Sequence, residues 1–380
     1  MMKFDVHVCL VSNQPTPNFV PVLSPEFRPQ EVVLVVTPQM AQQAEALAKV
    51  MKERCQVKVH QLKVDSEYDV AAIGERLFEL LVNIDKDKVA LNVTGGTKLM
   101  AIGAYGVFRD AGYASFYLTQ QGEVVLLDSQ QKLSLSAPKI LIEDYLALHG
   151  FTALDKPIRQ INQQWLPLAE ELAKRRSLAQ PLGSLNYEIS MLKNEADLMI
   201  EVAQVDEQNM AYLLSLLERY GLARLKNNQL TFVSEKAKQY VNGTWFEEYV
   251  FHVVKSLPNV QDCALGLQID LADEQGLGRN ELDVVVMAHN ALHVLECKTA
   301  NFTAKHLSNA ERNEPIYKLD TLKRLGGLRT RTALVSSREL TKPMKKRASG
   351  SDIYVLQQHD LSGLPTLLKN WLDKAQPRGD

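Results

Sequence analysis

Two acidic residues and a lysine in the C-terminal third of the chain have the spacing of a metal-dependent hydrolytic site. Asp283 lies in the apolar run ELDVVVM, and Glu296 and Lys298 lie at the end of the next run, ALHVLECK. If His289 and Asn290 form a two-residue turn between these runs, Asp283 lies opposite Glu296, with Cβ atoms about 4.5–5.5 Å apart. Lys298 follows Glu296 by two residues, so its side chain projects from the same face.

Facing carboxylates repel each other unless a cation lies between them. Hard divalent cations such as Mg²⁺ and Mn²⁺ prefer carboxylate oxygens and keep several bound waters. Such an ion activates water and polarises a phosphoryl oxygen, and Lys298 would orient that water or neutralise charge on the phosphate. The pattern therefore predicts a metal site at Asp283 and Glu296. The alternative is that these acids are ordinary surface charges on a two-sided hairpin.

A further acid is expected from a helix over 244–257, which precedes the hairpin. At about 100° per residue, Glu247 lies at the edge of the apolar stripe and can reach inward, whereas Glu248 points to solvent. The stripe consists of Phe246, Tyr249, Val250, Val253, Val254 and Leu257.

The segment 298–347 is strongly basic. It holds 13 Lys and Arg residues against 4 acids, a net charge of +9 in a chain whose net charge is −2. It is interpreted either as a track for backbone phosphates, with Lys318, Lys323 and Arg324 as members, or as a solvated basic face. His289 and His293 have no third ligand at metal spacing, so we expect a turn residue and a sheet residue.

The N-terminal 150 residues alternate strand-like and helical runs. Apolar strands between helices predict a parallel sheet covered on both faces, a doubly wound Rossmann-like α/β domain. The expected strands are 5–12, 31–37, 56–64, 88–93, 113–119 and 123–128, and the expected helices are 39–54, 68–83 and 97–110.

Two polar turns follow strands of this domain, where open α/β sheets bind ligands. The second turn offers a glycine pair, hydroxyls, a positive charge and the free N–H groups of a helix start, which together suit a phosphate. The Walker pattern G-x-x-x-x-G-K-[ST] is absent. The alternative is a tight turn with a helix cap. The candidate ligand-binding residues are Ser12, Asn13 and Gln14 in the first turn and Thr94, Gly95, Gly96, Thr97 and Lys98 in the second.

Residues 155–242 form a third kind of segment, with helices followed by a hairpin that turns at Asn227–Asn228. This order is winged-helix-like, a shape that serves either DNA binding or a linker. Because no helix here is rich in Arg and Lys, we favour a linker. The expected domains are therefore 1–150, 155–242 and an α/β domain over 243–380.

Composition indicates a cytoplasmic protein. No apolar run reaches the roughly 18–20 residues that a membrane span requires. The opening MMKFDVHVCLVS lacks a small-residue cleavage site, so we expect no signal peptide. The four cysteines are scattered, which favours buried reduced thiols over disulfides or a zinc site.

Asp283 and the triplet Glu296-Cys297-Lys298, after a helix that carries Glu247, resemble the PD-(D/E)xK nuclease pattern. The resemblance implies a restriction-endonuclease-like fold and a metal-dependent phosphodiesterase. It assigns Glu247, Asp283 and Glu296 to the metal and Lys298 to catalysis. The departure is Leu282, which stands where the pattern often has proline.

The stretch NVTGGTK and the turn at Ser12 resemble the CRISPR-associated Rossmann-fold (CARF) sensor domain. Together the three domains resemble the CRISPR ancillary nucleases of antiviral defence, which cyclic oligoadenylate gates. This resemblance implies a homodimer whose sensor domains enclose cyclic tetra-adenylate as an allosteric activator. It also implies cleavage of single-stranded DNA or RNA, or nicking of duplex DNA, often with Mn²⁺ preferred.

Two other functions remain open from the sequence. The chain would be a nucleotide-sensing transcription regulator if residues 155–242 bound duplex DNA and the C-terminal domain were structural. Alternatively, the sensor domain would itself be a phosphodiesterase that destroys its ligand. The second function has little support, because no evident general base lies near Thr94–Lys98.

Overall fold

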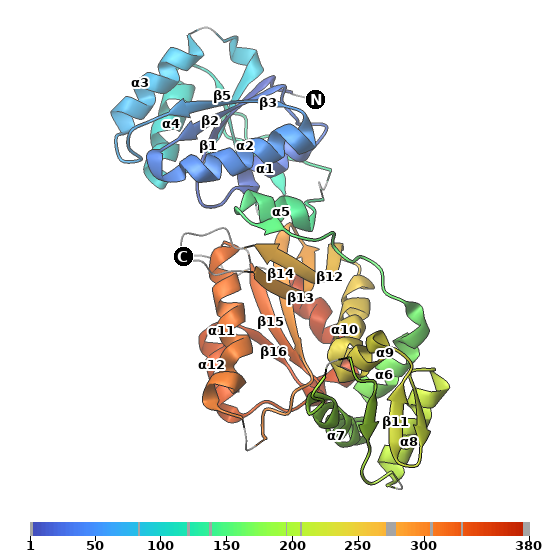
Figure 1. Cartoon of the computed structure of the whole chain (residues 1–380). Helices are drawn as coiled ribbons and strands as arrows, with labels where there is room; N and C mark the ends of the chain where they lie inside the picture. The colour runs from blue at the N-terminus through green and yellow to red at the C-terminus, as the bar shows by residue number, and fades with distance from the viewer. Residues whose placement is uncertain are drawn as a thin grey trace. The chain divides into compact units, whose positions relative to one another are not determined.

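The computed structural model describes residues 3–82, 84–119, 122–136, 139–194, 196–205, 207–270, 279–304, 307–327 and 330–374. The chain divides into two compact units (Figure 1). The first comprises residues 1–153, 270–279 and 326–328, and the second comprises 154–269, 280–325 and 329–380.

The first unit is built on a seven-stranded sheet with the order β3-β2-β1-β4-β5-β6-β7. The first five of these strands are parallel, whereas β6 and β7 pair antiparallel at one edge. Their bounds are Val6–Leu10 (β1), Glu31–Val36 (β2), Lys58–Lys63 (β3), Val89–Asn92 (β4), Ala114–Leu118 (β5), Glu123–Leu126 (β6) and Lys132–Ser134 (β7). The predicted doubly wound parallel sheet is confirmed.

Helices cover both faces of this sheet (Figure 1). On one face, α3 (Val70–Leu81) and α4 (Lys98–Asp110) pack on β1 and β2, with Leu10, Val35 and Leu77 in one apolar cluster. On the other face lie α1 (Thr16–Leu23) and α2 (Ala41–Cys55), and α2 contacts α5 (Ile142–Leu148).

Helix α1 was not predicted. It has Pro17 in its first turn and Pro21 in its interior, and prolines of this spacing favour a loop over a helix. Every residue from Thr16 to Val22 is buried. Burial of this segment against the sheet therefore outweighs its poor intrinsic helix propensity.

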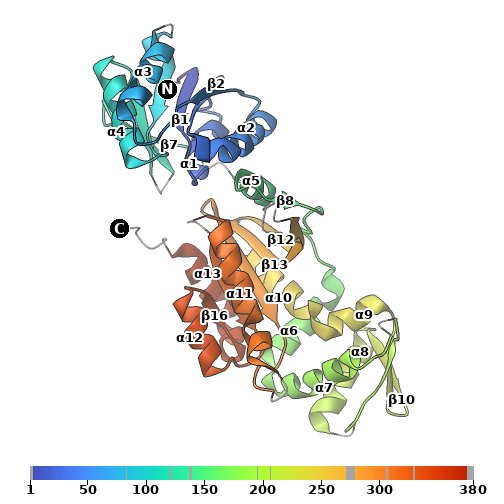
Figure 2. The same cartoon turned by 60° about the vertical axis from the view of Figure 1, so that its left-hand side comes forward.

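The second unit begins with a mainly helical segment that includes a small sheet (Figure 2). A three-stranded antiparallel sheet has the order β10-β11-β9, and Asn227 and Asn228 form the expected turn with φ of 49° and 62°. The elements are α6 (Leu166–Lys174), α7 (Ala179–Ser190), β9 (Met199–Glu201), α8 (Gln208–Arg219), β10 (Ala223–Lys226), β11 (Gln229–Phe232) and α9 (Glu235–Gln239).

The remainder of this unit is a mixed sheet with helices on both sides. Five of its strands follow the order β16-β15-β14-β13-β12; β13 and β14 pair antiparallel, and β14, β15 and β16 are parallel. The strands are β12 (Val260–Asp270), β13 (Arg279–Ala288), β14 (Ala291–Lys298), β15 (Arg331–Ser336) and β16 (Tyr354–Leu356), and the helices are α10 (Trp245–Lys255), α11 (Asn309–Leu325), α12 (Lys342–Gly350) and α13 (Leu364–Asp373).

One hydrophobic cluster joins the two parts of the second unit. It contains Leu213 and Leu217 of α8 together with Phe246 of α10 and Val284 and Leu295 of the β13–β14 pair. The helical segment and the mixed sheet therefore share one core.

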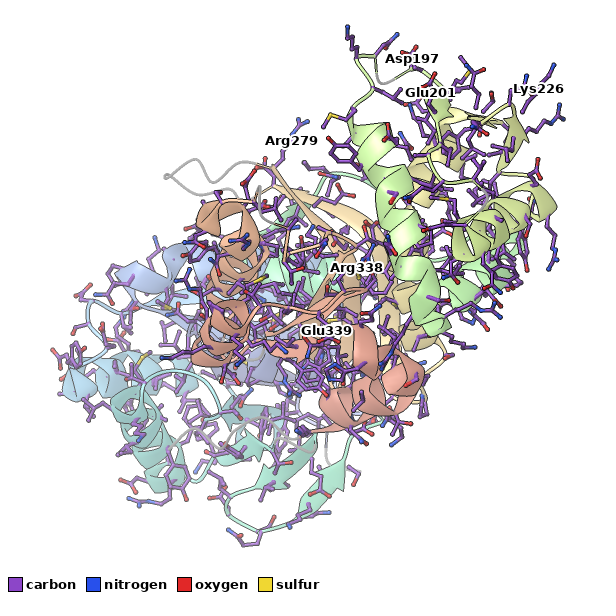
Figure 3. The ribbon with its side chains drawn as sticks, turned by 90° about the horizontal axis from the view of Figure 1, so that it is seen from below. Asp197, Glu201, Lys226, Arg279, Arg338 and Glu339 are labelled. Atoms are coloured by element: carbon purple, nitrogen blue, oxygen red, sulfur yellow. The ribbon has the colours of Figure 1, made fainter. Side chains whose placement is uncertain are left out.

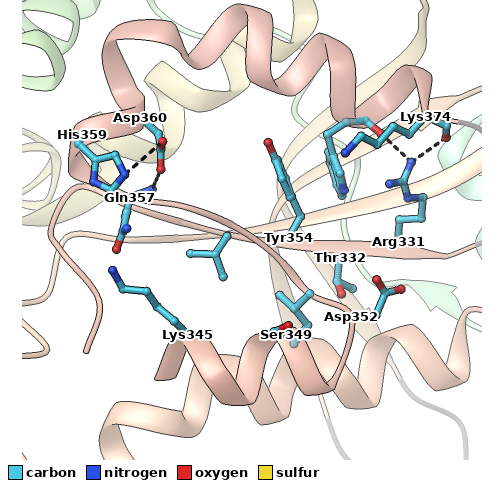
Figure 4. A pocket seen from close by; sticks show the side chains of 13 residues that line it. Arg331, Thr332, Lys345, Ser349, Asp352, Tyr354, Gln357, His359, Asp360 and Lys374 are labelled. Carbon is cyan, nitrogen blue, oxygen red and sulfur yellow. Dashed lines mark hydrogen bonds and ion pairs between the residues drawn. The ribbon is translucent and has the colours of Figure 1, made fainter. Parts of the chain in front are cut away.

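Strand β16 borders a cavity of about 560 Å³ between α12 and α13 (Figure 4). Tyr354 of β16 stacks on Trp371 of α13 with ring planes 10° apart. Arg331 donates hydrogen bonds to the carbonyls of Trp371 and Lys374, at 2.6 and 3.1 Å, and so fixes the end of α13.

In the described part of the chain, no helix is long and apolar enough to cross a membrane. All four cysteines are buried and free of disulfides, as expected.

Candidate active site and candidate ligand site

The β13–β14 hairpin has the predicted register. Its residue pairs run from Ala288 opposite Ala291 to Val284 opposite Leu295. The turn residues His289 and Asn290 both have left-handed φ, 53° and 54°, as a tight hairpin turn requires.

Asp283 and Glu296 come next along the two strands, and both are almost fully buried, at 7% and 1% exposure. Asp283 Oδ2 accepts a hydrogen bond of 2.8 Å from the backbone N–H of Cys297. The acid on β13 is thus tied to the segment of β14 that carries Glu296 and Lys298.

Two lysines neutralise these carboxylates. Lys298 Nζ lies 2.7 Å from Glu296 Oε1, as expected for two residues on one face of a strand. Lys318 Nζ, from α11, lies 2.6 Å from Glu296 Oε2 and 3.8 Å from Asp283 Oδ1. From its sequence context, Lys318 was expected only as a member of a basic stretch. The feature that could have identified Lys318 is its position on α11 between two apolar residues, Ile316 and Leu319, which are both buried.

Glu247 belongs to the same electrostatic group. It is half-buried in the first turn of α10. Burial, and then the charges of Asp283 and Glu281, raise its pKa to about 7. Because the charges of Asp283 and Glu281 affect the pKa of Glu247, its carboxyl group faces these acids, in agreement with the expectation that it reaches inward. Glu248 is also half-buried, and burial raises its pKa. The prediction of a solvated Glu248 was wrong because α10 is covered on more than one side.

The acids and lysines of the site shift one another's pKa values. Burial, followed by the charge of Glu296, raises the pKa of Asp283 to about 6, although Lys298 and Lys318 oppose this. Burial lowers the pKa of Lys298, but the carboxylates of Glu296 and Asp283 more than compensate and raise it overall. The arrangement is a buried cluster of carboxylates that two lysine ammonium groups compensate.

The donor set suits a hard divalent cation, since Asp283, Glu296 and Glu247 offer carboxylate oxygens. Within the described residues, no three His, Cys, Asp or Glu side chains converge closely enough to hold a metal as they stand. The two lysine ammonium groups occupy the space around Glu296 instead. Binding a metal would therefore require side chains to rearrange.

The other members of the basic stretch have structural contacts. Lys323 Nζ lies 2.7 Å from Asp352 Oδ2 and also donates to the carbonyls of Ser351 and Asp352, so it fixes the turn after α12. The side chain of Arg324 lies outside the described atoms. The phosphate track stays a prediction: Lys318 is paired with buried Glu296, and Lys323 is paired with exposed Asp352. His293 is buried in β14 against Trp371, as expected for a sheet residue.

In the first unit, the two polar turns meet at one edge of the sheet. Ser12, Asn13 and Gln14 follow β1, and Thr94 to Lys98 follow β4, the parallel neighbour of β1. Strand order reverses here, because β1 connects onward to β2 on its other side. This edge is the switch point at which open α/β sheets bind ligands.

Both glycines are required for the close approach of these turns. A Cβ at Gly95 would lie 2.3 Å from the carbonyl oxygen of Leu10, and one at Gly96 would lie 2.8 Å from Leu10 Cβ. Gly96 also has a φ of +76°. The pair thus lets the loop before α4 pack directly on the end of β1.

Two buried asparagines that the sequence analysis missed fix this geometry. Asn92 Nδ2 donates to Asn18 Oδ1 at 3.1 Å, and Asn92 Oδ1 accepts from the backbone N–H of Thr94. Asn18 Nδ2 donates to the carbonyl of Leu10 at 2.8 Å. The amides therefore connect β4, α1 and the end of β1. For Asn92 the signal in the sequence is a polar residue at the end of an apolar strand.

In the second turn, the two threonine side chains make structural hydrogen bonds, whereas the lysine side chain is exposed. Thr97 caps α4 by accepting from the N–H of Met100, and Thr94 Oγ1 accepts from the N–H of Leu118 at 2.8 Å. Lys98, the first residue of α4, is exposed. The helix-cap interpretation is thus correct for Thr97, and Lys98 stays available at the N-terminus of the helix.

Comparison with known proteins gives two family matches. Residues 6–145 match the model of the Card1 CARF domain, and residues 234–375 match the model of the Card1-like endonuclease domain. No curated protein sequence matches the chain.

Solved structures resemble the whole chain. Protein VC1899 from Vibrio cholerae is 26% identical, with a TM-score of 0.87 and 98% of each chain covered. Can2 from Sulfobacillus thermosulfidooxidans, solved in complex with cyclic tetra-adenylate, is 29% identical, with a TM-score of 0.80 and coverage of 97% of this chain and 98% of that one. A type III CRISPR defence DNA nuclease activated by cyclic oligoadenylate shares the fold, with 20% identity, a TM-score of 0.55 and coverage of 88% of this chain but 45% of that one.

These matches confirm the expected N-terminal CARF domain and C-terminal endonuclease domain. The chain therefore joins a Card1-type CARF domain to a Card1-like endonuclease domain.

Proposed function

We propose that this protein is a metal-dependent endonuclease of the PD-(D/E)xK type, activated by cyclic tetra-adenylate in CRISPR antiviral defence. The observation that carries the nuclease proposal is the buried pair Asp283 and Glu296 with Lys298 Nζ 2.7 Å from Glu296. The match to an endonuclease model over 234–375, which contains all of these residues, supports it.

In this proposal Asp283, Glu296 and Glu247 hold Mg²⁺ or Mn²⁺. When bound, such an ion polarises the phosphoryl group and lowers the pKa of a bound water. Lys298 keeps its positive charge because Glu296 and Asp283 raise its pKa overall. Its ammonium group donates hydrogen bonds to the phosphate as negative charge accumulates there.

The candidate ligand site supports a nucleotide activator. Lys98 places a positive charge at the N-terminus of α4, whose first N–H groups favour a phosphate. Ser12, Asn13, Gln14 and Thr94 add polar groups on the same sheet edge. The similarity to Can2, which was solved with cyclic tetra-adenylate, supports the choice of ligand.

The proposal includes a homodimer, and the surface beside Lys98 supports it. Leu99 and Ile102, on one side of α4, are 44% and 68% exposed. Large apolar side chains that are exposed to this degree favour an interface that covers them. A second copy that covers them would bring a second set of turns to the ligand. Ligand binding activates only insofar as the ligand binds the active arrangement more tightly.

For residues 155–242 we propose the role of a linker with a winged-helix-like shape. The segment shares its core with the nuclease sheet, which suits a structural connection. The outer end of its three-stranded sheet has mixed charge, with Asp197, Glu201 and Lys226 exposed (Figure 3). Helix α8 ends with Arg219 as its only basic residue. These features disfavour the alternative of a DNA-reading regulator.

The protein would act in the cytoplasm, where buried reduced thiols such as its four cysteines are the rule.

The decisive assay incubates the full-length protein with single-stranded DNA, single-stranded RNA and supercoiled plasmid. Each substrate is tested with Mn²⁺, Mg²⁺ or EDTA, with and without cyclic tetra-adenylate. We expect cleavage that requires the metal and rises with the activator. Glu296→Ala and Lys298→Ala should each reduce the rate at least about 100-fold, the scale of a lost electrostatic contact in catalysis.

Glu314→Ala removes an exposed acid from α11 and serves as the control. Cleavage that persists in the double variant Glu296→Ala/Lys298→Ala would refute the assigned site. Comparison of the three substrates shows whether the protein cleaves DNA or RNA, and whether it cleaves single strands or nicks duplex DNA.

A further inference from the structure

Lys318 is placed differently from Lys298, although both amines contact Glu296. The Lys318 ammonium lies 2.6 Å from Glu296 Oε2 and 3.8 Å from Asp283 Oδ1, so it forms ion pairs with both acids. Lys298 is paired with the other oxygen of Glu296, at 2.7 Å. The side chain of Lys318 is also the less exposed of the two, at 19% against 31%. Lys318 thus lies between the carboxylates, whereas Lys298 flanks them.

The helix that carries Lys318 is fixed on both sides of it. Arg312 donates to the carbonyls of Phe302 and Ala304, at 2.9 and 2.7 Å, near the start of α11. Lys323 is bonded to Asp352 near its end. Between these anchors Ile316 and Leu319 are fully buried. The Lys318 amine can therefore leave the carboxylates by rotating its own flexible stem, with no movement of the helix.

A divalent cation and this ammonium group would compete for one position. Mg²⁺ binds carboxylate oxygens at about 2.0–2.1 Å, and its site would include oxygens of both Asp283 and Glu296. An ammonium 2.6 Å from one of these oxygens fills the same space. Without any cation, two carboxylates buried to this degree would carry a large uncompensated cost. Lys318 relieves that cost while the metal is absent.

We propose that Lys318 is the resident counter-ion of the metal site, displaced when Mn²⁺ or Mg²⁺ binds. It stabilises the acids in the metal-free protein and, as a competitor, sets the metal affinity. This inference rests on the proposed metal-dependent function. It assigns Lys318 a role that differs from that of Lys298, which stays beside the phosphate.

The test measures Mn²⁺ affinity by isothermal titration calorimetry on the full-length protein, with no substrate present. Lys318→Met keeps the aliphatic stem and removes the competing charge. We expect Lys318→Met to bind Mn²⁺ at least tenfold more tightly than the unaltered protein, and Lys318→Arg to bind it no more tightly. The control is Lys346→Met, which removes an exposed amine from the neighbouring helix α12 and should change the affinity less than twofold.

Thermal melting in EDTA provides a second readout. Lys318→Met should melt at a lower temperature than the unaltered protein in EDTA, and saturating Mn²⁺ should remove most of this difference. If Lys318→Met is unfolded in EDTA, the titration is run on Lys318→Gln, which retains hydrogen-bond donors. Equal or weaker Mn²⁺ binding by the folded variant would overturn the inference while leaving the metal site intact. Failure of the unaltered protein to bind Mn²⁺ would instead refute the proposed metal dependence.

Discussion

The carboxylate of Asp283 accepts the backbone N–H of Cys297 at 2.8 Å, across the open end of the β13–β14 hairpin. Cys297 stands between Glu296 and Lys298, so one hydrogen bond aligns the acid of one strand with the acid and lysine of the next. Oxygen Oδ2 of Asp283 thus makes a structural hydrogen bond, while Oδ1 faces the ammonium group of Lys318.

This double role predicts that Asp283→Asn and Asp283→Ala will differ in stability but not in activity. Asparagine keeps an oxygen that accepts the Cys297 N–H, whereas alanine leaves that buried N–H unpaired at a cost of about 1–3 kcal/mol. Both lose the charge that would bind the metal, so both should lose at least about 100-fold in cleavage rate. Urea denaturation and plasmid cleavage measure the two effects. Equal stability of the two variants would show that the hydrogen bond contributes little.

The pKa values of Glu247 and Asp283 predict how the stability of the metal-free protein depends on pH. Burial raises these pKa values from 4.5 to about 7 and from 3.8 to about 6. The folded state therefore binds protons more strongly than the unfolded state between about pH 4 and 7. The free energy of unfolding should be largest below pH 4 from this contribution and fall as the pH rises to about 7.

Glu247→Gln should flatten the upper part of that decline, because the amide does not ionise. Urea denaturation in EDTA at pH 5 and pH 8 checks this, with Glu314→Gln on the exposed side of α11 as the control. A decline of the same size in Glu247→Gln would contradict the assigned cause. Added Mn²⁺ should oppose the decline, since a metal binds the ionised carboxylates.

The geometry of the hairpin was accessible from sequence because it depends on local chemistry. Strand alternation and the pair His289–Asn290, which tolerates left-handed φ, set the register that the structure has. Glu247 followed from helical periodicity in the same way. Lys318 did not, because its approach to Glu296 across 22 positions depends on how α11 packs on β14 and β15.

Burial explains the other differences between sequence and structure. Helix α1 forms despite Pro21 because the whole segment is covered, and Glu248 is half-buried because α10 has neighbours beyond its apolar stripe. Asn18 and Asn92 bond to each other from segments 74 positions apart. Local patterns predict elements and pairs within a hairpin, but contacts between distant segments require the tertiary arrangement.

Lys98→Ala should weaken binding of cyclic tetra-adenylate without affecting the fold of the sensor domain. The side chain is exposed at the first turn of α4, so its loss removes a charge that faces phosphate and creates no cavity. Loss of one charge-assisted contact is expected to cost about 1.5–3 kcal/mol, or roughly 10- to 150-fold in affinity. Calorimetric titration with the ligand measures this, and Lys52→Ala, an exposed lysine of α2, is the control. Unchanged affinity would exclude Lys98 from the ligand site.

Arg338 connects the helical segment to the strand beside Lys298. Ser337 N–H donates to the carbonyl of Lys298 at 2.9 Å. The next residue, Arg338, donates from its guanidinium to the carbonyl of Ala179 in α7. Arg338→Met removes this bond and should lower the free energy of unfolding by about 1.5–3 kcal/mol. Because the Lys298 backbone loses a fixed neighbour, the cleavage rate should fall several-fold at saturating Mn²⁺. Arg347→Met, at an exposed arginine of α12, is the control.

A second variant separates the Arg338 contact from general destabilisation. A Cβ at Gly183 of α7 would lie 2.5 Å from Arg338 Nη2, so Gly183→Ala pushes the guanidinium away from Ala179. Alanine also favours a helix by up to about 1 kcal/mol over glycine, so this variant should lose less stability than Arg338→Met. If the contact positions Lys298, Gly183→Ala should slow cleavage as much as Arg338→Met does, and combining the two should add little. A normal rate in Gly183→Ala would mean that α7 supports the fold without positioning Lys298.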